Sequence, residues 1–277
     1  MENINFIEKK QEKKYFNNQN NAKKNSFQDQ KRIVGKRLSF AASEAYKLLR
    51  TNLMFSMADE GKCKVIGVTS ALQGEGKSTT SINTAYTLAE TGKKVLLIEG
   101  DMRLPVAAKL LQLKTELGLS HVLAGICEPK DAISVSVALK NLNVLAAGEI
   151  PPNPSELLTS ERMKSLITGL SEIYDYIIID LPPITVVSDG LAISDLLSGM
   201  IIVVRQDYCD QRSLAETMRQ MEFLNVKVLG FVMNCSEVSK KSYKKYGKGY
   251  GYGYGYSYSY SQKYKEMLDK VESNSNN

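Results

Sequence analysis

The 277-residue sequence contains no tryptophan, a single histidine and four cysteines, and it has no long run of apolar residues. A helix that crosses a membrane needs about 18 consecutive apolar residues, and none of the runs approaches that length. Residues 1–14 alternate Asn, Glu and Lys instead of forming the apolar core of a signal peptide. We therefore expect neither a secreted nor a membrane-spanning protein.

The few cysteines and the single histidine also restrict the chemistry. The cysteines lie far apart and form no C-x-x-C pair, which disfavours a metal site or a cluster-carrying scaffold ATPase. A chain without a signal peptide is expected in the reducing cytoplasm, so we predict reduced, mostly buried thiols. A Ser-His-Asp triad or a His-ligated metal would depend on His121 alone, so we expect a structural role for this side chain. The cysteines are Cys63, Cys127, Cys209 and Cys235.

The charge of the chain is concentrated at its two ends. The sequence carries 36 Lys and Arg against 30 Asp and Glu, which is a formal charge of +6. Residues 1–40 hold ten basic and four acidic groups, and residues 240–277 hold eight basic and three acidic groups. The remaining 18 basic and 23 acidic groups make residues 41–239 acidic. The overall charge therefore does not indicate a nucleic-acid-binding domain.

The order of apolar segments predicts one α/β domain between two flexible ends. Residues 1–39 are rich in Asn, Gln and Lys, and residues 239–277 in Lys, Gly, Tyr and Ser, so both are expected to be disordered. Residues 40–238 start with an amphipathic helix at 44–57 and continue with short apolar runs between stretches of helical length. Strands that are apolar on both faces favour a doubly wound, mostly parallel sheet. The expected strands are 64–69, 94–98, 142–146, 176–180, 200–204 and 226–233, and the expected helices are 78–91, 106–113, 160–173, 188–197 and 212–224.

The first expected strand is followed by SALQGEGKST, residues 70–79, and then by a helix. This is the P-loop pattern G-x-x-x-x-G-K-[ST] with Ala71 in place of the first Gly. In such a loop the backbone N–H groups turn toward phosphates, Lys77 would reach the β- and γ-phosphates, and the Ser78 hydroxyl would bind Mg²⁺. A turn without a ligand is the alternative, which the order of strand, loop and helix disfavours. The expected nucleotide-binding residues are Gln73, Gly74, Glu75, Gly76, Lys77, Ser78 and Thr79.

Acidic residues follow two other expected strands. Glu99 and Asp101 come just after the run 94–98, two residues apart and so on the same side of an extended chain, and Asp180 ends the run 176–180. Ligands of open α/β sheets bind at the carboxyl ends of strands, and Mg²⁺ needs only one or two carboxylates besides phosphate oxygens. Solvated surface acids are the alternative. From its residues alone, the chain is an Mg-nucleotide-binding protein with an unknown phosphate acceptor.

Three segments, SALQGEGKST, VLLIEGDMRLP and YDYIIIDLPP, together resemble the bacterial tyrosine kinases of polysaccharide export, which share the P-loop class of the Min and Par ATPases. EAYKLLR at residues 44–50 is similar to the E-x-x-R-x-x-R helix of that family, and PPNPSELL at residues 151–158 is similar to a family loop. Min and Par proteins carry a signature Lys where this chain has Leu72, which favours the kinases.

The resemblance implies ATP and Mg²⁺ as cofactors and a role for each matching residue. Glu99, where the family usually has Asp, would accept the tyrosine proton. A positioned base is useful at neutral pH because a free tyrosine hydroxyl has a pKa near 10. Asn234, at the end of the run 226–233, matches a position that contacts adenine in related folds; a turn-forming Asn is the alternative. The implied catalytic residues are Lys77, Glu99, Asp101 and Asp180, and the implied Mg²⁺ ligands are Ser78, Asp101 and Asp180.

The resemblance also implies self-assembly and a substrate within the chain. Glu44, Lys47 and Arg50 would form the interface of a ring-shaped homo-oligomer such as an octamer, although Lys47 stands where the family has Arg. A flexible tail with nine tyrosines could enter the active site of a neighbouring subunit; a Gly/Tyr low-complexity segment that is no substrate is the alternative. The candidate phosphoacceptors are Tyr243, Tyr246, Tyr250, Tyr252, Tyr254, Tyr256, Tyr258, Tyr260 and Tyr264.

The sequence therefore predicts an ATP-dependent protein tyrosine kinase that phosphorylates its own tail in trans and regulates capsular or exopolysaccharide production. The implied partners are a membrane-anchored adaptor of the polysaccharide co-polymerase type, other copies of the chain and a cognate tyrosine phosphatase, and no nucleic acid. The expected location is the cytoplasm, at the inner face of the membrane where the adaptor recruits it. The alternative is a non-kinase ATPase switch of the Min/Par type that binds membrane or DNA.

Overall fold

The computed structural model describes residue 33 and residues 38–58, 61–135 and 141–236. Most of the two expected flexible ends, including all nine candidate phosphoacceptor tyrosines, lies outside the described residues. The predicted domain boundary between residues 238 and 239 also lies outside the described residues, and the division of the chain into domains stays a prediction. Within the described residues, no helix is both long and apolar enough to cross a membrane.

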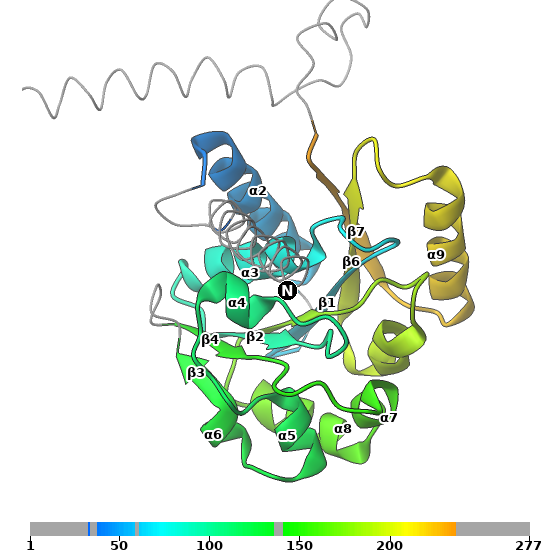
Figure 1. Ribbon diagram of the computed structural model, residues 1–277. Helices are drawn as coiled ribbons and strands as arrows, with labels where there is room; N and C mark the ends of the chain where they lie inside the picture. Colours follow the sequence, from blue (N-terminus) through cyan, green and yellow to red (C-terminus); the bar gives the residue numbers. More distant parts are fainter. Residues whose placement is uncertain (1–32, 34–37, 59–60, 136–140, 237–277) are drawn as a thin grey trace, which may run out of the picture.

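The described residues form a seven-stranded sheet in the order β3-β4-β2-β5-β1-β6-β7 (Figure 1). All neighbouring strands are parallel except β3, which runs antiparallel to β4 at one edge. The predicted doubly wound, mostly parallel α/β fold is confirmed. The strands are β1 Lys64–Ser70, β2 Val95–Glu99, β3 Ile133–Val135, β4 Leu142–Leu145, β5 Tyr176–Asp180, β6 Gly199–Arg205 and β7 Val228–Asn234.

The long helices and the short helix α4 were expected from the sequence, whereas four other short elements were not. The hydroxyls of Ser39 and Ser160 and the carboxylate of Asp210 cap the N-termini of α2, α8 and α9. The expected helix at 188–197 is a 3₁₀ helix, η1, and α5, α6, α7 and β3 occur where no element was predicted. The helices are α2 Phe40–Ser56, α3 Lys77–Ala89, α4 Ala107–Leu111, α5 Leu119–Ala124, α6 Pro129–Ala132, α7 Pro154–Leu158, α8 Glu161–Ser171, η1 Ser188–Leu196 and α9 Gln211–Phe223.

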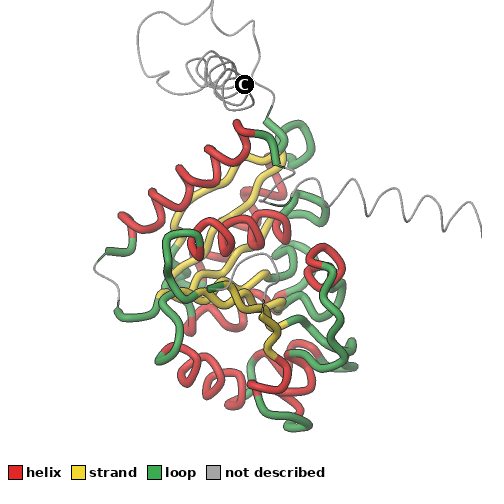
Figure 2. Tube along the Cα trace, turned by 90° about the vertical axis from the view of Figure 1, so that its left-hand side faces the viewer, coloured by secondary structure: helices red, strands yellow, loops and turns green. Residues whose placement is uncertain are grey.

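Helices cover both faces of the sheet, as Figures 1 and 2 show. Alternate residues of the buried strands face opposite sides. Ile66 and Val68 of β1 pack with α2 and α3, whereas Val65 packs in the cluster that includes α5, α8 and α9. This double burial explains why the central strands are apolar throughout.

The strand order brings the predicted site residues to one edge of the sheet. Strand β5 lies between β1 and β2, and its last residue, Asp180, is in register with Val68 of β1 and Glu99 of β2. The P-loop therefore begins two residues beyond a position that pairs with Asp180. All three predicted motifs meet at the carboxyl ends of three adjacent strands.

The cysteines lie just outside the helices and strands, and the histidine is the third residue of α5. Cys63, Cys127 and Cys209 are half-buried and Cys235 is exposed, so the prediction of mostly buried thiols is wrong, although all four are free thiols. Because each cysteine lies outside the neighbouring helix or strand, apolar neighbours in the sequence did not indicate a buried thiol. His121 accepts a hydrogen bond from the Gly118 N–H through Nδ1 at the start of α5, which is a structural contact.

Candidate nucleotide and phosphoryl-transfer site

The P-loop connects β1 to α3 through two residues in the left-handed region. Gly74 and Gly76 have φ values of 84° and 94°, where side chains are disfavoured. A Cβ on Gly76 would also lie only 2.0 Å from Nδ2 of Asn234. Gly76 precedes the first residue of α3, so the loop opens onto a helix N-terminus.

The side chain of Glu75 points into the protein. Its carboxylate accepts hydrogen bonds from the backbone N–H groups of Leu72 at 2.7 Å and Arg205 at 3.1 Å, and the residue is fully buried. A carboxylate that faced a bound triphosphate would repel it. If Glu75 contacts a nucleotide as predicted, it does so through its backbone, while its side chain holds the loop against the end of β6.

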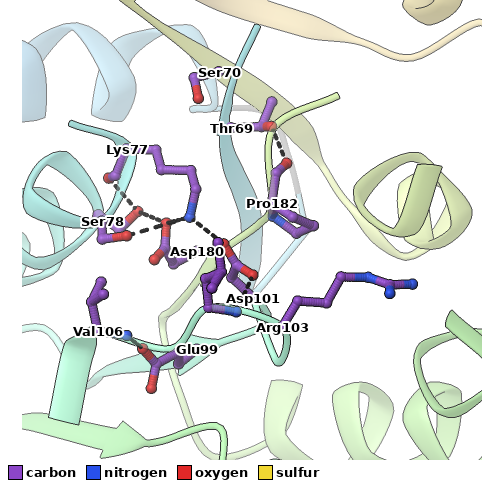
Figure 3. A network of polar contacts seen from close by, with 12 residues as sticks. Thr69, Ser70, Lys77, Ser78, Glu99, Asp101, Arg103, Val106, Asp180 and Pro182 are labelled. Atoms are coloured by element: carbon purple, nitrogen blue, oxygen red, sulfur yellow. Dashed lines mark hydrogen bonds and ion pairs between the residues drawn. The ribbon is translucent and has the colours of Figure 1, made fainter. Parts of the chain in front are cut away.

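Lys77 lies between two carboxylates (Figure 3). Its Nζ is 2.7 Å from Oδ2 of Asp101 and 3.7 Å from Oδ1 of Asp180, and it is 3.4 Å from the Ser78 hydroxyl. Burial opposes the charge of the ammonium group, but Asp180 and Asp101 raise its pKa above the usual value. Four of the predicted site residues thus form one buried cluster.

Asp180 carries an unpaired oxygen at the centre of this cluster. Oδ1 accepts a hydrogen bond from the Ser81 hydroxyl at 3.1 Å, whereas Oδ2 is buried without a partner among the described residues. Burial raises the pKa of this carboxyl, while Lys77 and Ser78 oppose the shift. An orphaned carboxylate oxygen beside a hydroxyl is the donor set that a hard divalent cation prefers.

The carboxylate of Glu99 holds two other segments together. Oε1 accepts hydrogen bonds from the N–H groups of Val106 and Ala107 at the start of α4, and Oε2 accepts one from Ala147 at 3.1 Å. The side chain is buried, and burial raises its pKa although the backbone donors oppose this shift. Both oxygens are therefore engaged by the protein.

Glu99 and Asp101 do not share one side of the chain, so that expectation is wrong. The N–H groups of Gly100 and Asp101 both donate to the carbonyl oxygen of Asp180, at 2.8 Å and 3.0 Å. Two consecutive N–H groups converge on one oxygen only where the chain bends, so the extended geometry ends at Glu99. The Asp101 carboxylate consequently reaches Lys77, while Glu99 turns toward α4 (Figure 3).

Arg103 joins three segments beside the cluster. Its Nε donates to Oδ2 of Asp189 at 2.7 Å, and its Nη2 donates to the Ser155 hydroxyl at 3.1 Å. The Ser155 hydroxyl also donates to Asp189, at 2.5 Å. Burial of Asp189 would raise its pKa, but the hydrogen bonds from Arg103 and Ser155 hold it below the usual range. This network connects the loop after β2 with α7 and η1.

The remaining predicted residues lie at the rim of the cluster or away from it. Gln73 is exposed and Thr79 is half-buried in the first turn of α3. Asn234 at the end of β7 donates through Nδ2 to the Glu75 carbonyl at 2.8 Å and accepts the Cys235 N–H through Oδ1 at 2.9 Å. Both of its polar atoms are thus engaged, and contact with adenine stays a prediction.

The predicted interface residues on α2 make contacts within the chain. Lys47 pairs with Glu44 at 2.7 Å, one turn away on the same helix. Arg50 donates to the Thr87 carbonyl of α3 at 3.0 Å and lies 4.0 Å from Glu90. A role for these side chains in assembly stays a prediction.

Several residues of the site were not predicted from the sequence. Arg205 and Tyr208 contact the P-loop from the end of β6, and Ser155 and Asp189 bind Arg103. Arg205 directly follows the expected strand 200–204, so its position at the same sheet edge was a usable signal. Ser155 lies in the segment PPNPSELL, but its sequence carries no sign of its partner.

The cluster fits a bound phosphate chain with Mg²⁺. Within the described part of the chain, no protein group accepts the N–H groups of Gln73, Gly74 and Gly76. These donors precede a helix N-terminus and the Lys77 ammonium group, which suits an anion. Ser78, Asp101 and Asp180 supply oxygen donors beside it, and Oδ2 of Asp180 is unpaired.

Comparison with known sequences agrees with this geometry. The AAA domain family matches residues 63–228. Tyrosine-protein kinase YwqD of Bacillus subtilis (strain 168) is 38% identical over 206 residues, which cover 74% of this chain and 86% of that protein. Tyrosine-protein kinase CpsD of Streptococcus pneumoniae serotype 4 is 36% identical over 214 residues, 76% of this chain and 92% of that protein.

Solved structures give the same result. The kinase domain of the Escherichia coli tyrosine kinase ETK superposes with a TM-score of 0.68 at 31% identity and covers 77% of this chain and 80% of its own. The chimerical protein CapA2B2 has a TM-score of 0.65 at 34% identity, over 69% of this chain and 83% of its own. MinD of Pyrococcus horikoshii, solved with Mg-ADP, shares the fold at 23% identity and a TM-score of 0.55, over 65% of this chain and 73% of its own.

The kinases are thus similar over most of both chains, and residues 63–228, which the AAA domain family matches, contain the whole P-loop cluster. MinD is similar in fold alone. The chain belongs to the bacterial tyrosine-protein kinases, whose catalytic domain has the P-loop fold.

Proposed function

We propose that this kinase binds ATP and Mg²⁺ at the P-loop cluster and transfers the γ-phosphoryl group to tyrosines of its own C-terminal tail in trans. The observation that carries the proposal is the buried cluster of Lys77 with Asp101 and Asp180 at the end of the P-loop. An ammonium group, a hydroxyl and two carboxylates at this position are the parts that phosphoryl transfer needs.

In this proposal each residue of the cluster binds or orients a charged group. The N–H groups of residues 73–76 and Lys77 would hold the phosphates, and Ser78, Asp101 and Asp180 would hold Mg²⁺ and its water. When bound, Mg²⁺ would supply charge neutralisation on the phosphate oxygens. The ion pair of Lys77 with Asp101 would exchange for these partners, so Lys77 and Asp101 would each have a partner of opposite charge before and after nucleotide binding.

The transfer also requires that the tyrosine hydroxyl lose its proton. Glu99 is predicted as the base from the family resemblance. Its Oε1 is held by Val106 and Ala107 at the start of α4, and its Oε2 accepts one hydrogen bond from Ala147, so the remaining lone pair of the buried Oε2 is where it would accept a proton. Phosphoryl transfer through a loose transition state depends mainly on positioning and charge stabilisation. The transfer to tyrosine can therefore proceed without a dedicated general base.

We also propose assembly, partners and location from the resemblance. The nine tail tyrosines, 243–264, would reach a neighbouring active site in a ring-shaped oligomer, an octamer in this proposal, with Glu44, Lys47 and Arg50 near the interface. A solved relative named as a chimerical protein, CapA2B2, supports a partner chain for such kinases. The partner would be a membrane-anchored adaptor that recruits this kinase from the cytoplasm to the membrane, where it regulates capsular or exopolysaccharide synthesis and export, and a cognate phosphatase would reverse the reaction.

The proposal is tested by incubating the full chain with Mg-ATP and the cytoplasmic tail of the organism's own polysaccharide co-polymerase. Mass spectrometry should then find phosphotyrosine between residues 243 and 264. Mixing a kinase-inactive chain with a tail-deleted active chain should phosphorylate the inactive chain if transfer occurs in trans. ATP hydrolysis without phosphotyrosine, together with nucleotide-dependent binding to DNA or anionic vesicles, would instead establish an ATPase switch of the Min/Par type.

A further inference from the structure

The carbonyl groups of the P-loop are all hydrogen-bonded within the protein. The six successive carbonyl oxygens from Ala71 to Gly76 each accept at least one hydrogen bond. The Leu72 carbonyl is bonded by the nearby Ser70 hydroxyl, the Gly76 carbonyl by the N–H of Thr80, and the Ala71 carbonyl by the Thr185 hydroxyl, 114 residues away. The three in the middle, at residues 73–75, are bonded by side chains from more than 100 residues away.

These three side chains come from the ends of two neighbouring strands. The Tyr208 hydroxyl, beyond β6, donates to the Gln73 carbonyl at 2.9 Å. Nη1 of Arg205 at the end of β6 donates to the Gly74 carbonyl at 3.3 Å, and its guanidinium carbon lies 5.0 Å from the centre of the Tyr208 ring. Asn234 ends β7, which is paired with β6, and donates to the Glu75 carbonyl at 2.8 Å.

Fixing the carbonyls also fixes the direction of the N–H groups. A peptide unit is planar, so a carbonyl oxygen held on one side of the loop directs the N–H of the next residue to the other side. The ties at residues 73–75 thereby direct the N–H groups of residues 74–76 away from β6 and β7. Of these, the N–H groups of Gly74 and Gly76 are accepted by no described protein group.

We propose that Tyr208, Arg205 and Asn234 are positioning residues for phosphate binding: they tie three consecutive P-loop carbonyls to the β6–β7 edge and so hold the loop in its anion-binding conformation before nucleotide arrives. The proposal rests on nucleotide binding at the P-loop and is independent of what accepts the phosphoryl group. A loop that spends less time in the binding conformation has an apparent affinity reduced by that fraction.

The proposal differs from a contact between Asn234 and adenine. Both polar atoms of the Asn234 amide are already engaged, Nδ2 by the loop and Oδ1 by the Cys235 N–H. A positioning role affects every ligand that uses the phosphate loop, whether or not the ligand carries a base. Pyrophosphate, which has no adenine, therefore separates the two roles.

The test measures the dissociation constants of Mg-ADP and Mg-pyrophosphate by calorimetry with the full chain. The variants are Tyr208→Phe, which removes only the hydroxyl and keeps the ring beside Arg205, and Asn234→Ala, alone and combined. One hydrogen bond contributes enough to change affinity by about two- to tenfold. We expect each single variant to weaken both ligands by a common factor in this range, and the double variant to weaken both more than either single variant does. Because the two side chains tie the same loop, the double-variant factor should differ from the product of the single factors.

The matched control is Tyr174→Phe. Its hydroxyl accepts a hydrogen bond from Asn143 at 2.7 Å, just before β5 and so at the opposite end of the sheet. This variant also loses a tyrosine hydroxyl and should leave both dissociation constants unchanged. Hydrogen exchange of the peptide that contains residues 72–76 should be faster in Tyr208→Phe than in Tyr174→Phe without ligand, and in tail phosphorylation the KM for ATP should rise by a larger factor than kcat falls in Tyr208→Phe.

Unchanged affinities in Tyr208→Phe and in the double variant would overturn the proposal. A loss for Mg-ADP alone would overturn it in favour of an adenine contact, and an equal loss in Tyr174→Phe would show a general effect on folding. If the wild-type chain bound neither ligand, the proposed nucleotide site itself would be wrong. Binding by the wild type without any tyrosine phosphorylation would refute only the kinase reaction.

Discussion

The two sides of the site are built in different ways. The P-loop side, residues 70–81, is one continuous segment from the end of β1 into α3. The α4 side consists of Glu99, Arg103 and the residues that they bind at Val106, Ala107, Ala147, Ser155 and Asp189, which come from separate loops and short helices. The functional residues of a continuous segment can be recognised as a motif in the sequence. The residues of the α4 side are far apart in the sequence and come together only in the folded protein.

The largest effect is expected on the P-loop side from Lys77→Met. The variant removes the positive charge that lies between Asp101 and Asp180. It also removes the side chain that we propose to bind the phosphates. We expect tyrosine phosphorylation by Mg-ATP to fall by about a hundredfold or more, measured by mass spectrometry of the tail.

The control for this variant is Lys93→Met, because Lys93 is exposed just before β2. It should retain wild-type activity. Normal phosphorylation in Lys77→Met would remove this P-loop from the mechanism and would make the α4 side the more important half of the site.

A smaller effect is expected on the α4 side from Glu99→Gln. The glutamine oxygen can still accept from Val106 and Ala107, but its amide group would face the Ala147 N–H, donor against donor. We expect the free energy of unfolding in urea to fall by about 1–3 kcal/mol, because a buried donor loses its acceptor. Because we treat Glu99 as a residue that holds the α4 side, kcat should fall by about tenfold or less.

This variant decides between two roles for Glu99. A general base contributes about 10²- to 10⁴-fold, so a loss of that size with unchanged stability would establish proton transfer by Glu99. Glu90→Gln is a suitable control, since Glu90 follows α3 and lies outside the P-loop cluster. It should change neither stability nor kcat by a comparable amount.

The difference between the two sides also explains what could be predicted from the sequence. The parallel sheet was predicted because its central strands are apolar on both faces, and the P-loop because seven neighbouring residues carry its chemistry. The short elements β3 and α5 show neither a helical period nor a continuous apolar run, so they were missed. Asp189, the second residue of the 3₁₀ helix η1, holds this helix in place through its hydrogen bond with Arg103. The sequence around Asp189 does not predict this contact.

The direction of Glu99 could not be predicted for a similar reason. Spacing alone placed it beside Asp101, but the bend after β2 is made by the Asp180 carbonyl, about 80 positions further along the chain. Its partner Ala147 is 48 positions away, and Arg103 is 86 positions from Asp189. Contacts between residues so far apart in the sequence depend on the order of the strands in the sheet. The pattern of apolar segments does not predict that order.

A pH-dependent effect is expected from Asp189→Asn. The pKa of Asp189 is lowered in the folded state, so its carboxylate stabilises the fold above the unfolded pKa of about 3.9, and this contribution is lost as the pH falls through the folded pKa. The variant should therefore reduce the free energy of unfolding by about 1–3 kcal/mol at pH 7, and by less below pH 4.

The matched control for this variant is Asp195→Asn on the same 3₁₀ helix, where the side chain is exposed. Urea unfolding at pH 7, 5 and 3.5 should show little change for this control at any pH. A constant difference between wild type and Asp189→Asn across these pH values would mean that Arg103 and Ser155 do not hold the charged form of Asp189, and the α4 side would lose its central ion pair.

The smallest effect is expected at Cys209, which reports on the P-loop side without taking part in it. Burial, with the nearby Glu75 carboxylate, raises the pKa of this thiol to about 11. Only the thiolate is alkylated, so in a chain whose other three cysteines are changed to serine the reaction with iodoacetamide should rise about tenfold per pH unit from 7 to 9.5 without a plateau. Because Glu75 points away from the phosphate side, Mg-ADP should leave this profile unchanged. A plateau near pH 9 that appears only with Mg-ADP would mean that the Glu75 carboxylate turns toward the ligand, and the P-loop side would then be rearranged by nucleotide rather than held ready for it.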